Sequence, residues 1–396
     1  MTILQRAPGT TGTRPDPASA AAALGTLPGP RPGSRPPAPA PAPGNATCGF
    51  EAARFQVDRC LDDLLAREAE RWCRLDRSLE LGFDLLRDFI AAGGKRLRPA
   101  FCWWGFVGGG GDRDDPRIVD LCAAVEMLHT FALVHDDVMD GSDTRRSSPT
   151  VHRSVAGCHA EQGWRGEERR VSEAVAVLLG DLAFVYADQL LRQQPAPVMA
   201  LFDEMRVELH VGQYLDLMAA ASPEPDQGRA ETVLRYKTAK YSVERPLHLG
   251  AALAGSLPQL EQGLSGYGLA VGEAFQLRDD LLGAFGDPAV TGKPRGDDFR
   301  EGKQTLLVHL ARRWCGERGR SAAAAVLARL GQPDLTPEEV DAICDILERS
   351  DARTCVEQRI DDLMARAGDE LRALDLEEPA RQALHELGRQ AAWRVT

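Results

Sequence analysis

The sequence predicts an all-α protein, a single large helical bundle with a central cavity between facing helices. Apolar residues recur at helical spacing through most of the chain after residue 45, and strand-like alternation is absent. No Pro- or Gly-rich linker divides that stretch. Length alone would permit two domains, but acidic motifs in both halves favour one bundle that brings them together.

The first 44 residues differ from the rest. They contain eleven of the 25 prolines, many alanines and almost no large apolar residue after Leu4. Such a segment cannot bury enough apolar surface to offset its ordering entropy. We therefore expect residues 1–44 to be a disordered tail and residues 45–396 to be the helical domain. The tail lacks the compact apolar core of a secretory signal, and an Arg- and Ala-rich transit peptide is the weaker alternative.

Beyond the tail, the pattern predicts one helix after another. The helical ranges are 54–90, 117–134, 171–192, 198–221, 229–253, 260–285, 305–328 and 337–374. Two glycines at 93–94 can end the first range, and Pro99 can open a further helix. Two polar stretches, 152–170 and 287–303, are expected to be loops. The second holds Asp297 and Asp298 and is a candidate lid.

Two aspartate-rich segments about 140 residues apart carry most of the functional information. Each is embedded in an apolar stretch with helical spacing, so their carboxylates would face a largely apolar interior. Like charges there repel and are costly to desolvate unless a cation neutralises them. Mg2+, which proteins hold with one or two carboxylates plus substrate phosphate, suits such a site. The segments are HDDVMD, with Asp136, Asp137 and Asp140, and FQLRDDLLGAFGD, with Asp279, Asp280 and Asp287.

Helix geometry sharpens the first segment. Asp136 and Asp140 are four residues apart and share a helix face, and His129 lies two turns earlier on the same side. A single DDxxD motif at a helix end is more often a pair of solvated acids. The second motif and the basic segments around it argue against that interpretation.

Basic residues are interleaved with the acidic motifs. Arginine binds phosphate through two hydrogen bonds and lysine binds it as a point charge, so this pattern predicts a substrate with several phosphate charges. One basic run alone would indicate an ordinary solvated patch. The basic segments are GGKRLRP, with Lys95 and Arg98, then Arg145 and Arg146, Lys237 beside Thr238, and Lys293.

At these residues the chain resembles the trans-isoprenyl diphosphate synthases, the polyprenyl synthetase family, over about residues 61–374. The motifs stand in family order: GGKRLRP, DDxxD followed by RR and PTVH, Gly180-Asp181, Gly212-Gln213, Lys237-Thr238, FQLRDD and GDPAVTGKPRGDD. Two positions depart from the pattern. Gly283 stands where the family often has a third aspartate, and Ser147 where glycine is usual. We expect metal binding to survive both changes and Gly283→Asp to be tolerated or mildly beneficial.

The resemblance implies an isoprenoid-synthase bundle and a Mg2+-dependent prenyltransferase that joins isopentenyl diphosphate to allylic diphosphates, with more than one ion per site. It also implies a homodimer. The implied metal ligands are Asp136, Asp140 and Asp279, supported by Asp137, Asp280 and Asp287. The residues implied for isopentenyl diphosphate are Lys95, Arg98, His129 and Arg146. Those implied for the allylic diphosphate are Arg145, Lys237, Thr238, Gln276 and Lys293.

Product length is expected to depend on residues one and two turns before Asp136. Ala132 is small and leaves room beyond a fifteen-carbon chain, whereas Phe131 and Leu128 are bulky enough to stop the chain soon after. An aromatic residue five positions before the motif resembles the geranylgeranyl diphosphate synthases. We therefore expect a twenty-carbon product, with farnesyl diphosphate second and longer chains third.

Three other functions fit parts of the sequence. A terpene cyclase would share the fold but needs no isopentenyl diphosphate site. His135-Asp136 could begin a phosphohydrolase metal site, but the further histidines are not found. A silent partner subunit is expected to lose acidic ligands, and here only position 283 is lost.

Composition limits location and partners. A net charge of −12 argues against nucleic-acid binding, which needs a basic face. Nine scattered cysteines without zinc spacing indicate reduced thiols in a cytoplasmic protein. We expect no apolar run long enough to span a bilayer, so no stable membrane insertion is predicted.

Overall fold

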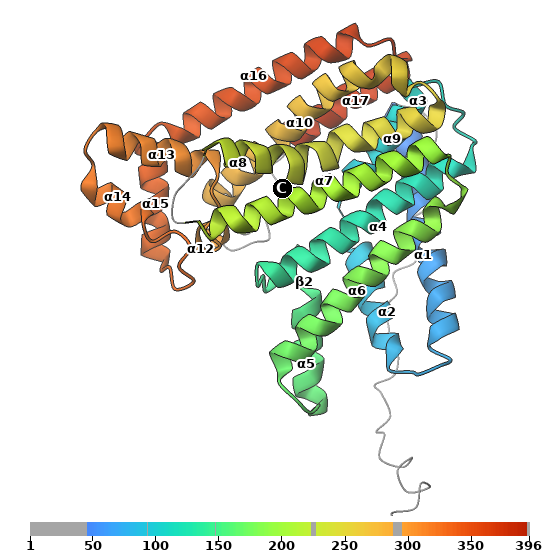
Figure 1. Ribbon diagram of the computed structural model, residues 1–396, viewed down its shortest axis with the longest axis horizontal. Coiled ribbons are helices and arrows are strands. Elements are labelled where there is room, and N and C mark those ends of the chain that lie inside the picture. Colours follow the sequence, from blue (N-terminus) through green and yellow to red (C-terminus); the bar gives the residue numbers. More distant parts are fainter. Residues whose placement is uncertain (1–45, 93, 147, 223–226, 288–294, 394–396) are drawn as a thin grey trace, which may run out of the picture. The chain divides into compact units, whose positions relative to one another are not determined.

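The computed structural model describes residues 46–92, 94–146, 148–222, 227–287 and 295–393. The predicted tail, residues 1–44, lies outside them, as do Ser147 and Lys293. Nearly all of the described chain is helical (Figure 1). The all-α prediction is confirmed.

The described elements run from α1 to α17 along the chain, with one two-stranded hairpin after α4. They are α1 (Ala46–Trp72), α2 (Leu79–Ala91), α3 (Leu97–Gly108), α4 (Pro116–Met139), β1 (Thr144–Arg145), β2 (Ser148–Pro149), α5 (Val151–Gln162), α6 (Glu168–Leu190), η2 (Leu191–Gln193), α7 (Ala196–Ala220), α8 (Gln227–Val233), η3 (Leu234–Glu244), α9 (Arg245–Ala254), α10 (Leu257–Phe285), α12 (Asp297–Arg300), α13 (Leu306–Glu317), α14 (Ser321–Leu327), α15 (Pro337–Arg349), α16 (Ala352–Ala373) and α17 (Glu378–Ala392).

Helix α4 forms the centre of one half of the bundle. Residues 121–128 are all buried, and α4 packs against α3 and α6. The helix begins where the sequence indicates, because the Asp115 side chain accepts a hydrogen bond from the Arg117 backbone N–H and Pro116 occupies the first turn. A helix that is apolar on all sides belongs in a core. The first acidic motif therefore lies at the end of a rigid element.

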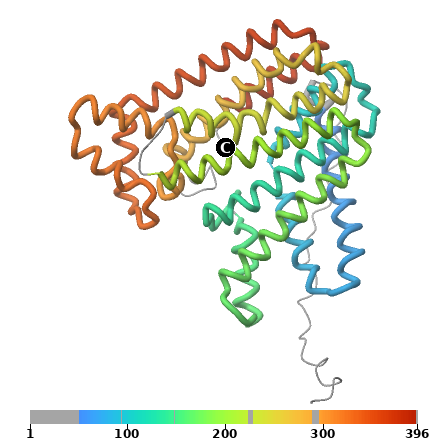
Figure 2. The backbone as a smooth tube through the Cα atoms, in the orientation of Figure 1, coloured from blue at the N-terminus to red at the C-terminus, as the bar shows by residue number. Residues whose placement is uncertain are grey.

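Helix α10 carries the second acidic motif and has the same role in the other half. It packs against α16, η3 and α9, and these helices run side by side in Figures 1 and 2. Segment η3 is a π-helix of eleven residues, with the wider turn that i→i+5 hydrogen bonding produces. It joins α8 to α9 and lies between α7 and α10.

Several expected ranges are divided in the structure. The range 54–90 contains a turn between α1 and α2, where the Asp76 carboxylate accepts a hydrogen bond from the Ser78 backbone N–H. The range 337–374 breaks at Asp351, whose φ is 58°. The expected loop 152–170 was wrong over most of its length, because α5 fills residues 151–162. Polar residues on the exposed face of α5 hid its helical period.

The expectation that no apolar run could span a bilayer was also wrong. Helix α4 and the span Glu168–Gln193 are long and apolar enough by length and composition. In α4, 67% of the most apolar stretch is buried within the protein, as in a core helix. In Glu168–Gln193 the buried share is 39%, which leaves apolar side chains of α6 exposed.

Candidate active site

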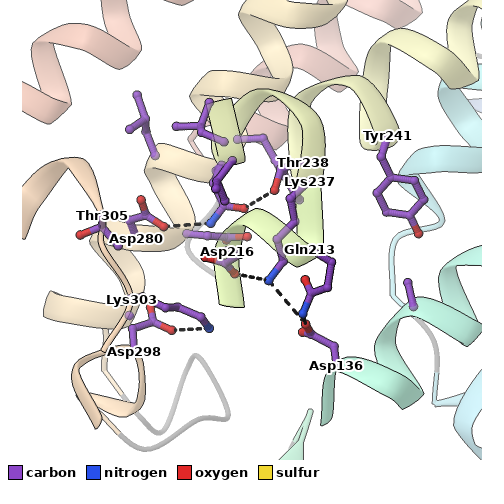
Figure 3. Close-up of a pocket in the computed structure, with 18 of the residues that line it drawn as sticks. Asp136, Gln213, Asp216, Lys237, Thr238, Tyr241, Asp280, Asp298, Lys303 and Thr305 are labelled. Atoms are coloured by element: carbon purple, nitrogen blue, oxygen red, sulfur yellow. Dashed lines mark hydrogen bonds and ion pairs between the residues drawn. The ribbon is translucent and has the colours of Figure 1, made fainter. Parts of the chain in front are cut away.

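A cavity of about 1140 Å³ lies between the two halves of the bundle. Side chains from α3, α4, α7, η3, α10 and α13 line it. Acidic and basic groups face one another across the cavity, as Figure 3 shows for Asp136 and Lys237 on one side and Asp298 and Lys303 on the other. Both acidic motifs reach this space, through Asp136 from α4 and through Asp279 and Asp280 from α10.

Asp136 is the most closely surrounded carboxylate of the first motif. Its Oδ1 accepts a hydrogen bond from the Gln213 amide at 3.1 Å and lies 3.5 Å from the Lys237 Nζ. Burial opposes ionisation, yet Lys237, Lys303 and Arg145 together hold the pKa of Asp136 below its ordinary value. Asp136 is therefore ionised and can serve as a metal ligand at neutral pH.

Asp137 has a different position from Asp136. It is buried outside the cavity lining, and its Oδ1 accepts hydrogen bonds from the Arg145 guanidinium at 2.6 and 2.7 Å. The same guanidinium lies 3.7 Å from Asp136 Oδ2. This pairing ties the turn after α4 to the end of the helix, so Asp137 orients the motif rather than facing the ligand space.

Asp140 caps the C-terminal end of α4 and faces Lys303. The distance from its Oδ2 to the Lys303 Nζ is 3.8 Å. Burial, together with repulsion from Asp136, raises the pKa of Asp140 to about 7. Such a carboxylate favours a cation in addition to Lys303 and Lys237.

The second motif presents two adjacent carboxylates. Asp279 and Asp280 both line the cavity, and Asp287 is exposed outside it. The Asp280 Oδ1 accepts a hydrogen bond from the Gln276 amide at 2.8 Å, and Gln276 in turn accepts one from the Thr238 hydroxyl at 2.7 Å. Burial raises the pKa of Asp280 to about 7.

The residues present fit Mg2+ that is held jointly by protein carboxylates and substrate phosphate, as the sequence predicts. Among the described residues, no three His, Cys, Asp or Glu side chains converge closely enough to hold an ion unaided. Hard divalent cations of this type are often held by one or two carboxylates and completed by substrate phosphate. Burial is the main cause that raises the pKa of both Asp140 and Asp280, and a cation placed beside a buried carboxylate offsets that effect. Asp136, Asp140 and Asp279 would hold the ions.

The basic wall of the cavity is built around Arg98. Its guanidinium donates to Ser242 at 2.8 Å and to the His129 Nε2 at 3.1 Å, and lies over the Tyr241 ring. Arginine can only donate, so the Nε2 accepts and the His129 Nδ1–H donates to the Tyr241 hydroxyl at 3.0 Å. Burial and the neighbouring Arg98 lower the pKa of His129 well below its ordinary value, so the imidazole is neutral.

Lys95 and Arg146 complete this wall. Both line the cavity. Burial lowers the pKa of Arg146, and repulsion from Arg145, Arg96 and Arg98 lowers it further, while attraction to Glu126 acts in the opposite direction. A gathering of cations around a residue with a lowered pKa favours an anionic ligand. The structure thus brings together every described residue that the sequence linked to isopentenyl diphosphate.

Arg96 holds the segment that carries these residues. It has a positive φ of 51°, and its guanidinium donates to Glu126 at 2.6 Å, to Asp58 at 2.9 Å and to the Ile90 carbonyl. Arg96 and Glu126 are both buried. The motif GGKRLRP does not indicate that Arg96 differs in role from Lys95 and Arg98. In the structure Arg96 anchors the turn before α3.

Segment η3 brings Lys237, Thr238 and Tyr241 to the cavity (Figure 3). It passes unusually close to α7, because a Cβ on Gly212 would lie 2.4 Å from the Lys237 backbone nitrogen. Only glycine allows this approach. The Lys237 Nζ lies 2.6 Å from Asp216 Oδ2, and burial is outweighed by Asp136 and Asp216, so the pKa of Lys237 is raised.

Aromatic residues close the cavity away from the acidic motifs. Phe131 and Ala132 line it with His210 from α7. The Phe131 ring meets that of Phe184 at 4.9 Å in an edge arrangement. Leu128, expected at this floor, is instead fully buried in the core and outside the cavity lining. Leu128 lies two turns before Asp136 on α4, and its side chain points to the core side of the helix.

Four residues of the site were not assigned from the sequence: Gln213 as a contact of Asp136, Asp216, Asp298 and Lys303. Asp216 lies three residues after Gln213, one helical turn along the same face, and that spacing could have identified it. Lys303 ends the polar stretch expected to be a lid. Its ammonium contacts carboxylates at three positions, which raises its pKa well above the ordinary value despite burial.

Comparisons with known proteins agree with this geometry. Residues 82–347 match the family model described as polyprenyl synthetase. The chain is 32% identical over 318 residues to a geranylgeranyl diphosphate synthase of Mycobacterium tuberculosis, covering 77% of this chain and 81% of the relative. It is 34% identical over 238 residues to a geranylfarnesyl diphosphate synthase of Aeropyrum pernix, covering 58% and 70%.

Solved structures give the same result. A geranylgeranyl pyrophosphate synthase from Corynebacterium glutamicum, complexed with isoprenyl diphosphate and magnesium, superposes with a TM-score of 0.81 at 36% identity. The match covers 86% of this chain and 98% of that one. A polyprenyl synthase from Caulobacter crescentus, complexed with calcium and isoprenyl diphosphate, gives a TM-score of 0.68 at 30% identity, covering 84% and 98%.

Proposed function

This chain belongs to the polyprenyl synthetase family and is a prenyltransferase, and we propose that its product is geranylgeranyl diphosphate. The observation that carries the proposal is a cavity in which two acidic motifs face a cluster of cations, with an aromatic floor. In this proposal, residues 45–396 form the catalytic domain.

The basic wall would bind isopentenyl diphosphate. Lys95, Arg98 and Arg146 supply positive charge, and the neutral His129 keeps Arg98 in place without adding a charge of its own. Arg98 is held by three partners, so its remaining donors are fixed in direction before a ligand arrives.

The acidic wall would bind the allylic diphosphate. This part of the cavity is lined by Lys237, Thr238 and Gln276, with Arg145 at its edge. The family resemblance also assigns Lys293 to the allylic diphosphate, and Lys293 lies outside the described residues. Mg2+ ions, when bound, neutralise charge on the leaving pyrophosphate and so promote ionisation to an allylic carbocation. Asp136, Asp140 and Asp279 would hold these ions, with more than one ion in each site.

After ionisation, the double bond of isopentenyl diphosphate attacks the allylic carbon and a proton is lost. The released pyrophosphate is the most suitable proton acceptor, so no side-chain base is assigned. The apolar walls beside Phe131 and Ala132 exclude water, which would otherwise quench the cation.

The floor supports a twenty-carbon product. Ala132 leaves room below the acidic motif, and Phe131 closes the cavity with Phe184 and His210 behind it. Farnesyl diphosphate is the alternative, and relatives with both product names occur among the similar proteins. Incubation of the purified protein with Mg2+, isopentenyl diphosphate and each allylic starter, followed by chromatographic sizing, tests the proposal. A main product of fifteen carbons, or of more than twenty, would contradict it, and absence of any condensation would favour a silent partner subunit.

A second copy of this chain is the proposed partner. Helices α6 and α7 contact each other through Arg206, whose guanidinium lies 2.7 Å from Asp188 and over the Phe184 ring. Their outer faces expose apolar side chains at helical spacing, which an isologous dimer would bury. The exposed residues are Leu178 and Val185 on α6 and Val207, Val211, Tyr214 and Met218 on α7.

The oligomeric state tests this surface. Leu178→Glu should shift the protein from dimer to monomer in light scattering coupled to gel filtration, because it would bury a charge at the interface. Leu75→Glu is the matched control, since Leu75 is also exposed but lies between α1 and α2. A monomeric wild-type protein would overturn the proposal. Dimer formation would also cover the apolar face of α6, in keeping with a soluble, cytoplasmic enzyme.

A further inference from the structure

The second acidic motif lacks a carboxylate that the first one has. In the first motif Asp136 is followed four residues later by Asp140, on the same face of the helix. In the second motif the residue four positions after Asp279 is Gly283, which has no side chain. Gly283 nevertheless lines the cavity, so its position belongs to the site.

A carboxylate from another segment fills the space above Gly283. A Cβ built on Gly283 would lie 2.3 Å from the Asp298 Oδ2, far closer than two such atoms can approach. A side chain at position 283 would therefore require the Asp298 carboxylate to move from its observed position. Asp298 also lines the cavity and faces Lys303 in Figure 3.

The backbone fixes Asp298 in this position. The Gly296 N–H donates to the Gly283 carbonyl at 3.4 Å, which joins the start of α12 to the end of α10. Phe299 is buried, and its carbonyl accepts a hydrogen bond from Gly331 at 2.8 Å. The Asp298 side chain thus stands on a segment anchored at both ends of α12.

Asp298 is electrostatically connected to the first motif. Its Oδ1 lies 3.0 Å from the Lys303 Nζ, and the same ammonium lies 3.8 Å from Asp140 Oδ2. The arrangement places a third carboxylate on the side of the second motif, one that faces the first motif across one lysine.

We propose that Asp298 supplies the carboxylate that the second acidic motif lacks at Gly283, and that it holds a divalent cation together with Asp279. The inference rests on the proposed function, because it concerns the metal site of that reaction. Gly283 then contributes to the same metal site, because the absence of a side chain at this position leaves space for the Asp298 carboxylate. The expectation that Gly283→Asp is tolerated or mildly beneficial stays a prediction, and in this arrangement the new aspartate would take the place of the Asp298 carboxylate.

Binding of inorganic pyrophosphate in the presence of Mg2+, measured by titration calorimetry, tests the inference without turnover. Asp298→Asn should weaken this binding by about 10- to 100-fold, the usual effect of losing a group that supports a metal site. Gly283→Ala should also weaken it, because the added methyl group pushes the Asp298 carboxylate aside. Alanine favours the helix over glycine, so this variant should fold at least as well.

Moving the carboxylate gives the sharpest comparison. The double variant Gly283→Asp with Asp298→Gly should bind pyrophosphate and Mg2+ more tightly than Asp298→Gly alone, by about 10-fold. Asp334→Asn, which removes an exposed carboxylate on a nearby loop, is the matched control and should bind as the wild type does.

Two results would overturn this inference while leaving the proposed function intact. If the wild type binds pyrophosphate with Mg2+ but Asp298→Asn and Gly283→Ala bind equally well, Asp298 is only a partner of Lys303 and the inference is overturned. The inference is also overturned if the double variant is no better than Asp298→Gly. A wild-type protein without Mg2+-dependent binding would overturn the proposed function itself.

Discussion

The Phe131 and His210 rings stack with their centroids 5.5 Å apart and their planes inclined by 28°. One ring comes from α4 and the other from α7, and both line the cavity. The floor of the site is therefore shared between two helices. The sequence placed it on α4 alone.

Product length should respond to changes in both helices. Phe131→Ala should lengthen the main product, because it removes the ring that closes the cavity, and His210→Ala should have a smaller effect in the same direction. Ala132→Phe should shorten the product. Gas chromatography of the dephosphorylated products gives chain length directly. Leu128→Val is the control, since Leu128 is in the core: it should lower stability and leave the product unchanged.

Loss of a metal ligand should affect turnover far more than substrate binding. Asp136→Asn or Asp140→Asn should reduce kcat by several orders of magnitude, because the ions act as the leaving group departs. Excess chelator should abolish activity and Mg2+ should restore it. Asp143→Asn, at an exposed position just beyond the motif, should retain activity. Full turnover in chelator would rule out the metal-dependent mechanism.

The basic wall should control one substrate selectively. Arg98→Lys keeps the charge but loses the planar fork that contacts Ser242 and His129 together. We expect KM for isopentenyl diphosphate to rise by about 10-fold or more, as for loss of a charged hydrogen bond, with KM for the allylic substrate nearly unchanged. Steady-state kinetics with each substrate varied in turn distinguish the two. An equal rise in both KM values would mean that Arg98 supports the fold rather than one subsite.

A buried ion cluster behind the cavity should matter for stability. Glu208 on α7 accepts two hydrogen bonds from Arg245, at 2.6 and 2.7 Å, and lies 3.0 Å from the Lys240 Nζ. Glu208→Gln leaves two cations with one carboxylate fewer and should cost about 3–5 kcal/mol of unfolding free energy. Urea unfolding measures this loss.

The same glutamate predicts a pH dependence. Burial opposes its ionisation, but hydrogen bonds from Arg245 and Lys240 hold the pKa of Glu208 below its ordinary value. A lowered folded-state pKa contributes stability that is present above the unfolded pKa and is lost as pH falls through the folded value. The stability difference between wild type and Glu208→Gln should therefore be full near neutral pH and shrink in acid. A difference that grows in acid would contradict this assignment.

The sequence predicted the helices best where local chemistry decides. The expected helix starts at residues 117 and 337 agree with the structure to within one residue. In the structure Asp115 caps the first helix ahead of Pro116, and the capping box of Thr336 and Glu339 surrounds Pro337. The sequence missed the break at Asp351 and the helix α5, because one left-handed residue or a mostly polar face leaves the apolar period almost unchanged.

The site shows the same division. Asp136, Asp279 and Arg98 could be predicted from the sequence because each lies in a short motif of charged residues. Contacts between segments distant in sequence could not be read in this way. The approach of Asp298 to Gly283 depends on how α12 packs on α10, and the position of His210 depends on how α7 crosses α4.

The π-helical form of η3 has a consequence for how this family member can vary. An α-helix advances by about 100° per residue, so removing one residue from a wide turn would let the segment relax to α-helix and rotate everything after it. Lys237 and Tyr241 both point into the cavity from this turn. Substitutions here change one contact at a time, whereas a single deletion would turn a whole wall of the cavity away. We expect the length of this segment to be under stronger constraint than the identity of most of its residues.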